Sequence, residues 1–409
     1  MTFSRLPQPG VAVSASGPDG ARRADATAVP VFVGHTASGV HDVAPVDSFA
    51  AFRRRYCNDA APEDASAVFY RTIENYFENG GNPCHVHSLG QRAAAGAFYR
   101  ARGVAWERLW RDLPDATLVG FPEAGAIEDD DIDAWVDCWA TLLHSMAQHR
   151  NLFALVDLPR RGATACAALQ RLQGRVPAAT LRFGAAYWPF VVTAYHPHGK
   201  TGVLDRRAVP PSGVVATVFQ KTDATRGVWK APANLPLAHV VAPDVDGRAA
   251  LAAAARQEGL SSINLIRAFP GRGTRVWGCR TLQPDARNAR AYVQGSRTMA
   301  YIEKSLADVC RFAVFEANDD ITWMKLKGSA YAWLHAFWRS GGLAGADEDE
   351  AFQLAIGPGM TMTADDIAAG RAIVRIGLAL QRPAEFIDLH FVLQSGELSR
   401  WDAAAQARP

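Results

Sequence analysis

The sequence predicts a mixed α/β fold, in which a mixed β-sheet core is flanked by helices and both ends of the chain are extended. Short apolar runs rich in β-branched and aromatic residues, such as PVFVGHT at 30–36, are typical of buried strands. Amphipathic segments of helical length, such as 129–149, lie between these runs. Residues 4–28 are instead rich in Pro, Gly, Ser, Ala and Asp, and hold only one short apolar alternation, at Val11 and Val13.

In the first part of the chain, strands and helices alternate. The strand at 30–36 ends at a glycine, and the helix predicted at 47–56 opens with an Asp-Ser pair as cap candidates. A second helix at 63–78 stops at Asn-Gly-Gly, a common signal for a helix C-terminus. CHVHSL at 84–89 then alternates as a strand does.

A strand–helix–strand unit follows. TLVGFPE at 117–123 and LFALVDLP at 152–159 have the composition of buried strands, and the helix at 129–149 lies between them. Parallel strands need a crossover connection of this length, so the unit predicts a partly parallel sheet.

The remaining chain is predicted to continue the mixed fold. AAYWPFVVTAY at 185–195 is expected to be one buried strand, and 196–247, with its Pro-Pro, Gly and Asn residues, to be loop-heavy. The later elements are, in order, a helix from 248, strands at 263–269 and 275–282, helices near 292–310 and at 320–340, a short helix starting at Thr363, strands at 371–380 and 386–394, and a tail at 396–409.

Composition limits the class of protein. The 409 residues can bury a sizeable core, and 49% hydrophobic with 21% charged residues is ordinary for a soluble globular chain. A formal net charge of +2 argues against a dedicated nucleic-acid surface. No segment approaches the roughly 18 to 20 apolar residues of a membrane helix, and we expect no secretory signal. The six cysteines are scattered, as in a chain made in a reducing cytoplasm.

Two segments resemble nucleotide-binding motifs, but each lacks a required glycine. HPHGKT at 196–201 has Ala194 where a phosphate loop needs glycine, and PGRGTRVW at 270–277 has Val276 in place of the third glycine of a dinucleotide fingerprint. Neither a nucleophile elbow nor a zinc-binding His-Glu-x-x-His helix occurs. A cytosolic α/β hydrolase or nucleotide-binding enzyme stays as the alternative from another class.

Two histidine pairs could supply metal ligands. In a strand, His85 and His87 would share one face while Cys84 lies on the other, and His196 and His198 form the second pair. A zinc site would need further ligands from distant segments, so a structural role for these residues is favoured. The sequence predicts no catalytic residue, no cofactor and no metal.

Two other clusters have simple structural interpretations. The acidic run at 128–133 lies where a helix begins, and carboxylates there are favoured by capping and by the helix dipole. Tyr331, Trp333, Phe337 and Trp338 are interpreted as a core or interface stripe.

A series of motifs in the C-terminal 200 residues resembles the contractile phage tail sheath family, which includes the sheaths of tailocins and extracellular contractile injection systems. Each motif is weak alone, but together they occur in family order. They are AAYWPFV (185–191), VPPSG (209–213), TDATRGVWKAPAN (222–234), VWGCRTL (276–282), YIEKSL (301–306), FAVFEANDD (312–320), TWMKLK (322–327), EAFQL (350–354) and RPAEFI (382–387).

The N-terminal half resembles the family more loosely, through AVPVFVGHT at 28–36 and YFENGGNPCHVHSL at 76–89. Ala317 replaces the family's usual proline, and the arm lacks the usual acidic pair. The segment between Leu89 and Thr117 leaves no room for a large protruding domain, so a short, core-only member is expected.

The resemblance implies an N-terminal arm at 1–28, two parts of a core at 29–184 and 185–385, and a C-terminal strand and tail at 386–409. It implies that the arm and the strand pair with sheets of neighbouring subunits, through backbone hydrogen bonds. In the strand, alternate residues form a wholly apolar face that would promote aggregation if left unpaired. The residues assigned to this exchange are Val11, Val13, Phe386, Ile387, Leu389, Phe391 and Leu393.

The same resemblance implies a structural subunit that polymerises helically around an inner tube and contracts. Its expected partners are copies of itself, the inner tube protein, and baseplate and tail terminator proteins, with no nucleic acid and no membrane insertion. The helix at 320–340 is expected to face the tube, with Lys325, Lys327 and Arg339 toward an acidic surface. Assembly is expected in the bacterial cytoplasm, as part of a phage tail or released particle. A type VI secretion sheath is the nearer alternative, although those sheaths are normally split across two chains.

Overall fold

The computed structural model of the protein describes residues 27–38, 40–59, 67–91, 105–125, 127, 131–149, 151–193, 208–244, 262–284 and 289–382. Several predicted features lie outside these residues. They are the strand-exchange residues Val11, Val13, Phe386, Ile387, Leu389, Phe391 and Leu393, the phosphate-loop-like segment with His196 and His198, and the helix expected to start at 248.

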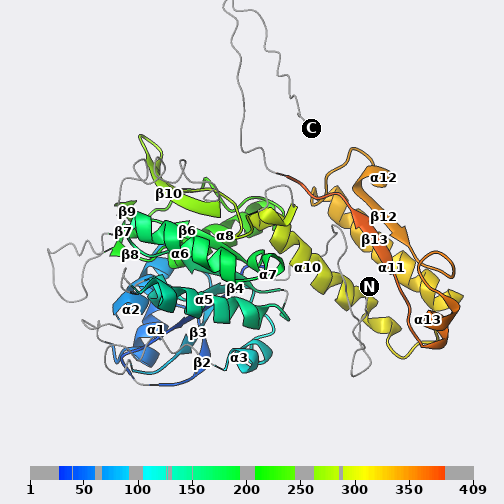
Figure 1. Ribbon diagram of the computed structural model, residues 1–409, viewed down its shortest axis with the longest axis horizontal. Helices are drawn as coiled ribbons and strands as arrows, with labels where there is room; N and C mark the ends of the chain where they lie inside the picture. The colour runs from blue at the N-terminus through cyan, green and yellow to red at the C-terminus, as the bar shows by residue number, and fades with distance from the viewer. Residues whose placement is uncertain are drawn as a thin grey trace, which may run out of the picture.

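An eight-stranded sheet lies at the centre, in the order β11-β10-β6-β5-β4-β1-β3-β2 (Figure 1). Every pairing from β10 to β3 is parallel, and the outer strands β11 and β2 are antiparallel, so the predicted mixed sheet is confirmed. The strands are β1 (Pro30–Gly34), β2 (Val43–Val46), β3 (Cys84–Ser88), β4 (Leu118–Gly120), β5 (Phe153–Asp157), β6 (Gly184–Trp188), β10 (Ile263–Phe269) and β11 (Gly273–Trp277).

Helices cover both faces of this sheet. Because successive strand side chains point to opposite faces, Val31 and Val33 enter one core while Phe32 enters the other. Strands buried on both faces appear as continuous apolar runs, which explains their signal in the sequence. The first core contains α3 (Trp106–Asp112), α4 (Pro122–Gly125), α5 (Ile132–Met146), α6 (Gly162–Arg175) and α7 (Ala178–Leu181). The second contains α1 (Phe49–Tyr56), α2 (Ala67–Glu78) and α8 (Ser212–Arg226).

Capping residues start the predicted helices. The Ser48 hydroxyl accepts a hydrogen bond from the Ala51 amide at 3.2 Å and begins α1. Asp131 accepts from the Ala134 amide at 3.1 Å and begins α5, so the capping role predicted for the acidic run is confirmed for this residue.

The prediction that 196–247 is loop-heavy is wrong for residues 212–226, which form α8. Every residue from Ser212 to Gln220 is buried, so this part of the helix has no polar face. A helix buried all round lacks the 3.6-residue alternation that marks an amphipathic one, and the preceding prolines suggested a turn.

The prediction of one strand over 185–195 is also wrong. β6 ends at Trp188, a cis peptide joins Trp188 to Pro189, and β7 (Val191–Thr193) enters a second sheet with β8 (Ala208–Val209) and β9 (Val240–Pro243). Proline has no N–H to donate to a β-ladder, so the strand cannot continue through it. The strand expected at 117–123 is shorter for a similar reason, since Pro122 begins α4.

The last part of the chain forms a separate C-terminal module, defined here as residues 301–380, with its own core. In Figure 1, α10 (Val293–Cys310) leads from the body of the molecule to this module. Trp333 and Phe337 lie in the module core, which confirms the core interpretation for these two residues, whereas Tyr331 is 42% exposed. The other elements are α11 (Asp320–Arg339), α12 (Glu348–Ala351), β12 (Phe352–Ala355), α13 (Ala364–Ala368) and β13 (Arg375–Leu378).

The close contact of α8 with α2 can be tested at Gly213. A Cβ atom there would lie 2.6 Å from the Thr72 carbonyl oxygen, so Gly213→Ala should destabilise the protein by about 1–3 kcal/mol. Gly174 in α6 has open space around it, and Gly174→Ala should stabilise by about 0.5–1 kcal/mol. Chemical denaturation of both variants checks this pair, and equal effects would contradict the packing described.

Candidate functional site

The parallel sheet has a topological switch point at β1, which pairs with β3 on one side and β4 on the other. Open α/β sheets bind ligands outside the carboxyl ends of their strands at such a point. Here the chain itself fills that place. His35 Nδ1 lies 2.8 Å from Glu123 Oε2, and Glu123 is only 3% exposed.

Asp157 ends β5, which pairs with β4 on the side away from β1, and is completely buried. Its Oδ1 accepts a hydrogen bond from the Ser212 amide at 2.8 Å, so the carboxyl group lies at the first residue of α8. Burial raises the pKa of Asp157 to about 7, despite the opposing hydrogen bond from Ser212. A carboxyl group with such a pKa is often functional, but this one is closed to solvent.

The candidate metal ligands do not converge among the residues that the structure describes, where no group of three or more His, Cys, Asp or Glu could hold an ion. As predicted, His85 and His87 lie on one face of β3, opposite the buried Cys84. His85 Nε2 lies 3.0 Å from Asp115, and burial lowers the pKa of His87.

The dinucleotide-like segment forms a hairpin turn. Gly271 and Gly273 adopt positive φ angles of 69° and 71° between β10 and β11, and a strand follows where the motif requires a helix. The segment therefore lacks the strand-to-helix turn of a dinucleotide site as well as the third glycine. Of the helices described, none is both long and apolar enough to cross a membrane.

The first described residues are held by a buried polar cluster of Thr27, Asp223 and Arg297. Arg297 donates to both carboxylate oxygens of Asp223, at 3.0 and 2.6 Å, and its Nη2 donates to the Thr27 carbonyl at 2.8 Å. The Thr27 hydroxyl donates to Asp223 at 2.6 Å. Both charged side chains are at most 6% exposed, and the Arg297 guanidinium lies 4.8 Å from the centre of the Phe219 ring.

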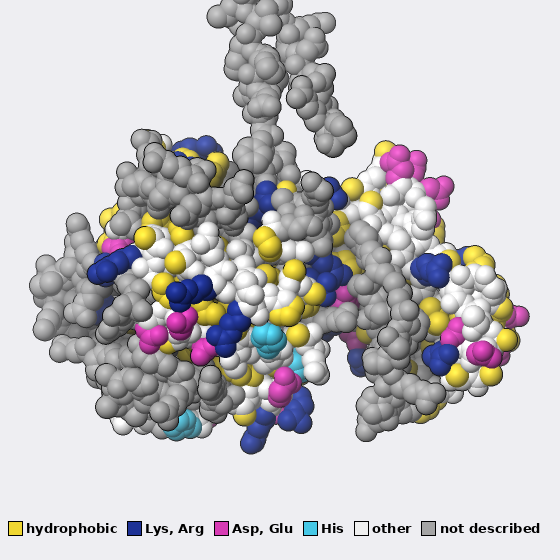
Figure 2. All heavy atoms as spheres, in the orientation of Figure 1, with side chains coloured by type: hydrophobic (Ala, Val, Ile, Leu, Met, Phe, Trp, Pro, Cys, Tyr) yellow, Lys and Arg dark blue, Asp and Glu magenta, His cyan; other side chains and the backbone are white. Residues whose placement is uncertain are grey.

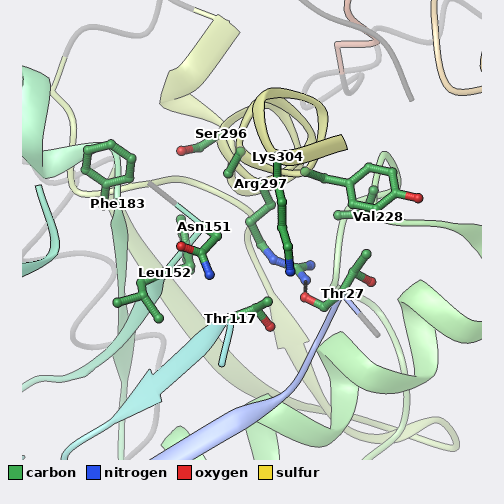
Figure 3. A pocket seen from close by; sticks show the side chains of 12 residues that line it. Thr27, Thr117, Asn151, Leu152, Phe183, Val228, Ser296, Arg297 and Lys304 are labelled. Carbon is green, nitrogen blue, oxygen red and sulfur yellow. Dashed lines mark hydrogen bonds between the residues drawn. The ribbon is translucent and has the colours of Figure 1, made fainter. Parts of the chain in front are cut away.

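Figure 3 shows Thr27 and Arg297 of this cluster from the side of a small pocket beneath α10, with Arg297 and Lys304 pointing from the helix toward Thr27. The pocket also meets the amino ends of β4 and β5, through Thr117 and Leu152. Its volume of about 30 Å³ holds a water molecule but no metabolite.

The last described residues meet the same helix. Leu380 and Gln381 line a narrow crevice together with Gln294, Gly295 and Thr298 of α10. The buried Gln294 Oε1 and Thr298 Oγ1 have no hydrogen-bond partner in the described part of the chain.

Two hydrogen bonds to residues outside α10 also hold Gln381 in place. Lys230 Nζ donates to Gln381 Oε1 at 2.8 Å, and the Gln381 amide donates to the Gly341 carbonyl. Both ends of the described chain thus lie against one turn of α10.

The C-terminal module carries a two-stranded antiparallel sheet, β12–β13. Phe352, Leu354, Ile376 and Leu378 form its inner face and belong to the module core with α11. Within the described residues, neither outer edge of this sheet pairs with another strand. Unpaired edges of this kind are templates for strand addition.

The predicted tube-facing residues Lys325, Lys327 and Arg339 are all exposed on α11, but they do not form one cluster. At 3.6 residues per turn, Lys325 and Arg339 lie about 40° apart around the helix, whereas Lys325 and Lys327 lie about 160° apart. Lys327 is one turn before Tyr331, whose hydroxyl donates to Glu348 at 3.0 Å. Figure 2 shows acidic side chains gathered over α12 on that part of the module.

Sequence reasoning missed the exposed apolar residues near Lys325. Ile321 and Met324 are 64% and 74% exposed, and Phe315, with a φ of 76°, is 90% exposed before α11 begins. Their signal was present in the sequence, since Ile321 and Met324 fall outside the helical phase of the buried stripe.

The buried carboxyl group predicts a pH dependence of stability. The unfolded chain ionises Asp157 near its ordinary pKa of 3.8, while the folded chain keeps it protonated to about pH 7. Stability should therefore fall as pH rises from about 4 to about 7 and stay lower above that range. Between about pH 4 and pH 7 the free energy of unfolding of Asp157→Asn should rise relative to that of the wild type by about a few kcal/mol, measured by chemical denaturation at several pH values. Parallel pH profiles for the two proteins would contradict this account.

The chain was compared with protein-family models, curated proteins and solved structures. No protein-family model and no curated protein matches the chain. A solved structure titled the anti-feeding prophage (AFP) baseplate in contracted state matches at 32% identity and a TM-score of 0.79, over 97% of this chain and 100% of that one.

Two further solved structures are sheaths. The AFP helical sheath in contracted state matches at 28% identity and a TM-score of 0.67, over 96% and 100% of the two chains. The sheath complex of an extracellular contractile injection system, PVC, matches at 27% identity and a TM-score of 0.69, over 97% and 99%. These relatives match over essentially the whole length of both chains, so the chain belongs to the contractile tail sheath family and is a structural subunit of a contractile sheath.

Proposed function

We propose that this protein polymerises helically around an inner tube and contracts to drive the tube through a target envelope. The observation that carries the proposal is the β12–β13 sheet, which is apolar on its inner face and has both edges open within the described residues. A sheet of two short strands is marginal alone, and added strands would stabilise it.

The terminal segments have the composition to supply those strands. Ile387, Leu389, Phe391 and Leu393 alternate, so a strand formed by them would extend the apolar face that covers α11. Val11 and Val13 form the short apolar alternation of the N-terminal arm, and Phe386 begins the predicted C-terminal strand. Each subunit would then donate segments 1–28 and 386–409 to neighbours and keep 29–385 as its own body and module, with Thr27 and Ala28 at the root of the arm held on its own body. Such head-to-tail pairing does not close on itself and yields a helix.

The tube would meet the flank of α11 that carries Lys325 and Arg339. Basic residues there suit an acidic tube, and the neighbouring Ile321 and Met324 add apolar surface to the same contact. Lys327 belongs to the flank nearer the acidic α12 and is the weaker candidate. Baseplate and tail terminator proteins would bind the two ends of the polymer, in line with the relatives from a baseplate and a sheath.

We assign no catalytic activity, metal or cofactor to the subunit. The switch point filled by His35 and Glu123 supports this, because an α/β enzyme would keep that place open for its ligand. Nucleic acid and membrane are not proposed as partners. Assembly would take place in the bacterial cytoplasm, in a phage tail or a released particle. The matched structures favour a sheath built from one kind of chain over a two-chain type VI sheath, since single chains match nearly the whole sequence.

Deletion of the arm tests strand exchange. A protein that lacks residues 1–20 should stay soluble and melt cooperatively, because the deleted segment has few apolar residues to bury, and it should fail to form striated tubes in electron microscopy. Removing 386–409 should also abolish tubes. A double-glycine insertion near Gly20 is the control, since it lengthens the arm without altering its pairing residues. Normal tubes from the 21–409 protein would refute the arm-exchange proposal.

Charge reversal separates the two flanks of α11. Lys325→Glu with Arg339→Glu should weaken assembly around an acidic tube by about tenfold or more, and added salt should mask the difference. Lys327→Glu should leave assembly near the wild-type level, with equal melting temperatures as the check on folding. If only Lys327→Glu impairs assembly, in co-sedimentation of sheath with tube, the other flank faces the tube.

A further inference from the structure

Both ends of the described chain contact the same helix. The Thr27 carbonyl accepts from Arg297 of α10, and Leu380 and Gln381 line a crevice with Gln294, Gly295 and Thr298 of the same helix. These α10 residues span 294–298, little more than one helical turn. Two ends of the described chain that are more than 350 positions apart in the sequence thus contact the same short stretch of α10.

The N-terminal attachment is the stronger of the two. Asp223 receives hydrogen bonds from Thr27 and Arg297, and both charges are buried, so the cluster resists solvent and salt. It also joins α8 to α10, because Asp223 belongs to the former and Arg297 to the latter. Gln220 of α8 adds a hydrogen bond to the Ala28 carbonyl at 3.1 Å.

The helix that carries both attachments also joins the two parts of the molecule. Val293, at the start of α10, lies in a core of the body, while Ile302 and Leu306 lie in the module core. A displacement of α10 would therefore move the roots of both segments together with the module that receives strands from neighbours.

We propose that residues 294–298 of α10 are a common anchorage for the two terminal segments of a subunit, with Arg297 as the positioning residue. Tension that enters through one segment leaves through the other across a single helical turn, instead of passing along β1 into the eight-stranded sheet. The inference rests on the proposed exchange of terminal strands between subunits, because only then do both segments carry load during contraction.

The test weakens the anchorage without leaving a buried charge unpaired. Asp223→Leu with Arg297→Met removes both charges together, which is close to neutral for folding when the replacements pack well. The matched control is Arg290→Met with Glu303→Leu. This pair is also largely buried, at 13% and 8% exposure with 3.3 Å between the charged groups, and Glu303 lies on α10, but neither residue belongs to the Thr27 cluster or the Gln381 crevice.

Sheaths of each variant are assembled around the tube and triggered to contract, and electron microscopy counts intact and broken contracted sheaths. The Asp223→Leu, Arg297→Met sheaths should assemble and then break several-fold more often than the wild type, while the control sheaths contract intact. An intact fraction equal to that of the wild type, or equal breakage in the control, would overturn the anchorage. Absence of any sheath from the wild-type chain would instead overturn the proposed function.

A milder variant covers the case in which the double replacement does not fold. Thr27→Val removes only the hydroxyl that donates to Asp223 and keeps the buried ion pair. It should melt like the wild type and still raise the fraction of broken sheaths, by less than the double replacement. A wild-type fraction of intact sheaths from a normally melting Thr27→Val protein would also overturn the anchorage.

Discussion

The burial of α8 against the central sheet is the contact on which the rest of the structure depends. The amide of its first residue, Ser212, donates a hydrogen bond to Asp157 of β5, and Gly213 lies against the Thr72 backbone of α2. About two turns later Gln220 donates to the Tyr76 hydroxyl and the Ala28 carbonyl, and Asp223, near the end of the helix, accepts from Arg297. A single helix therefore joins the sheet, a neighbouring helix, the root of the N-terminal segment and the helix that leads to the C-terminal module. Such a position leaves no side of its first half for solvent, which explains why those residues are apolar or small and hydrogen-bonded.

The body and the C-terminal module differ in how completely they are packed. The body has two dense cores on opposite faces of one sheet, and the place where a related fold would bind a ligand is filled by its own side chains. The module has a small third core and a two-stranded sheet whose edges are open among the described residues. Backbone groups at such edges gain free energy when another strand pairs with them, so the part of the chain that is least complete alone is the part suited to polymerise. α10 connects the two, and its position determines how the module is presented.

The candidate site could be predicted in part. The sequence located α11 and its three basic residues correctly on the surface of one helix. It did not separate Lys327 from Lys325 and Arg339, because charge alone does not say which flank a neighbouring element covers. That distinction needed α12, whose acidic first turn binds Tyr331. The cluster of Thr27, Asp223 and Arg297 was not predicted at all, since no spacing rule relates residues so far apart in the chain.

The sequence by itself determined the local elements and the family. Side-chain caps such as Ser48 and Asp131 act within one helical turn, and continuous apolar runs mark strands buried on both faces, so these signals are readable without the fold. The tertiary structure alone decided that α8 is a helix and that the two ends of the described chain share one turn of α10. Uniform burial erases the periodicity that would mark a helix, and a contact between residues 27 and 297 exists only once the sheet has brought α8 and α10 together. Local chemistry is encoded position by position, whereas long-range pairing depends on the whole packed chain.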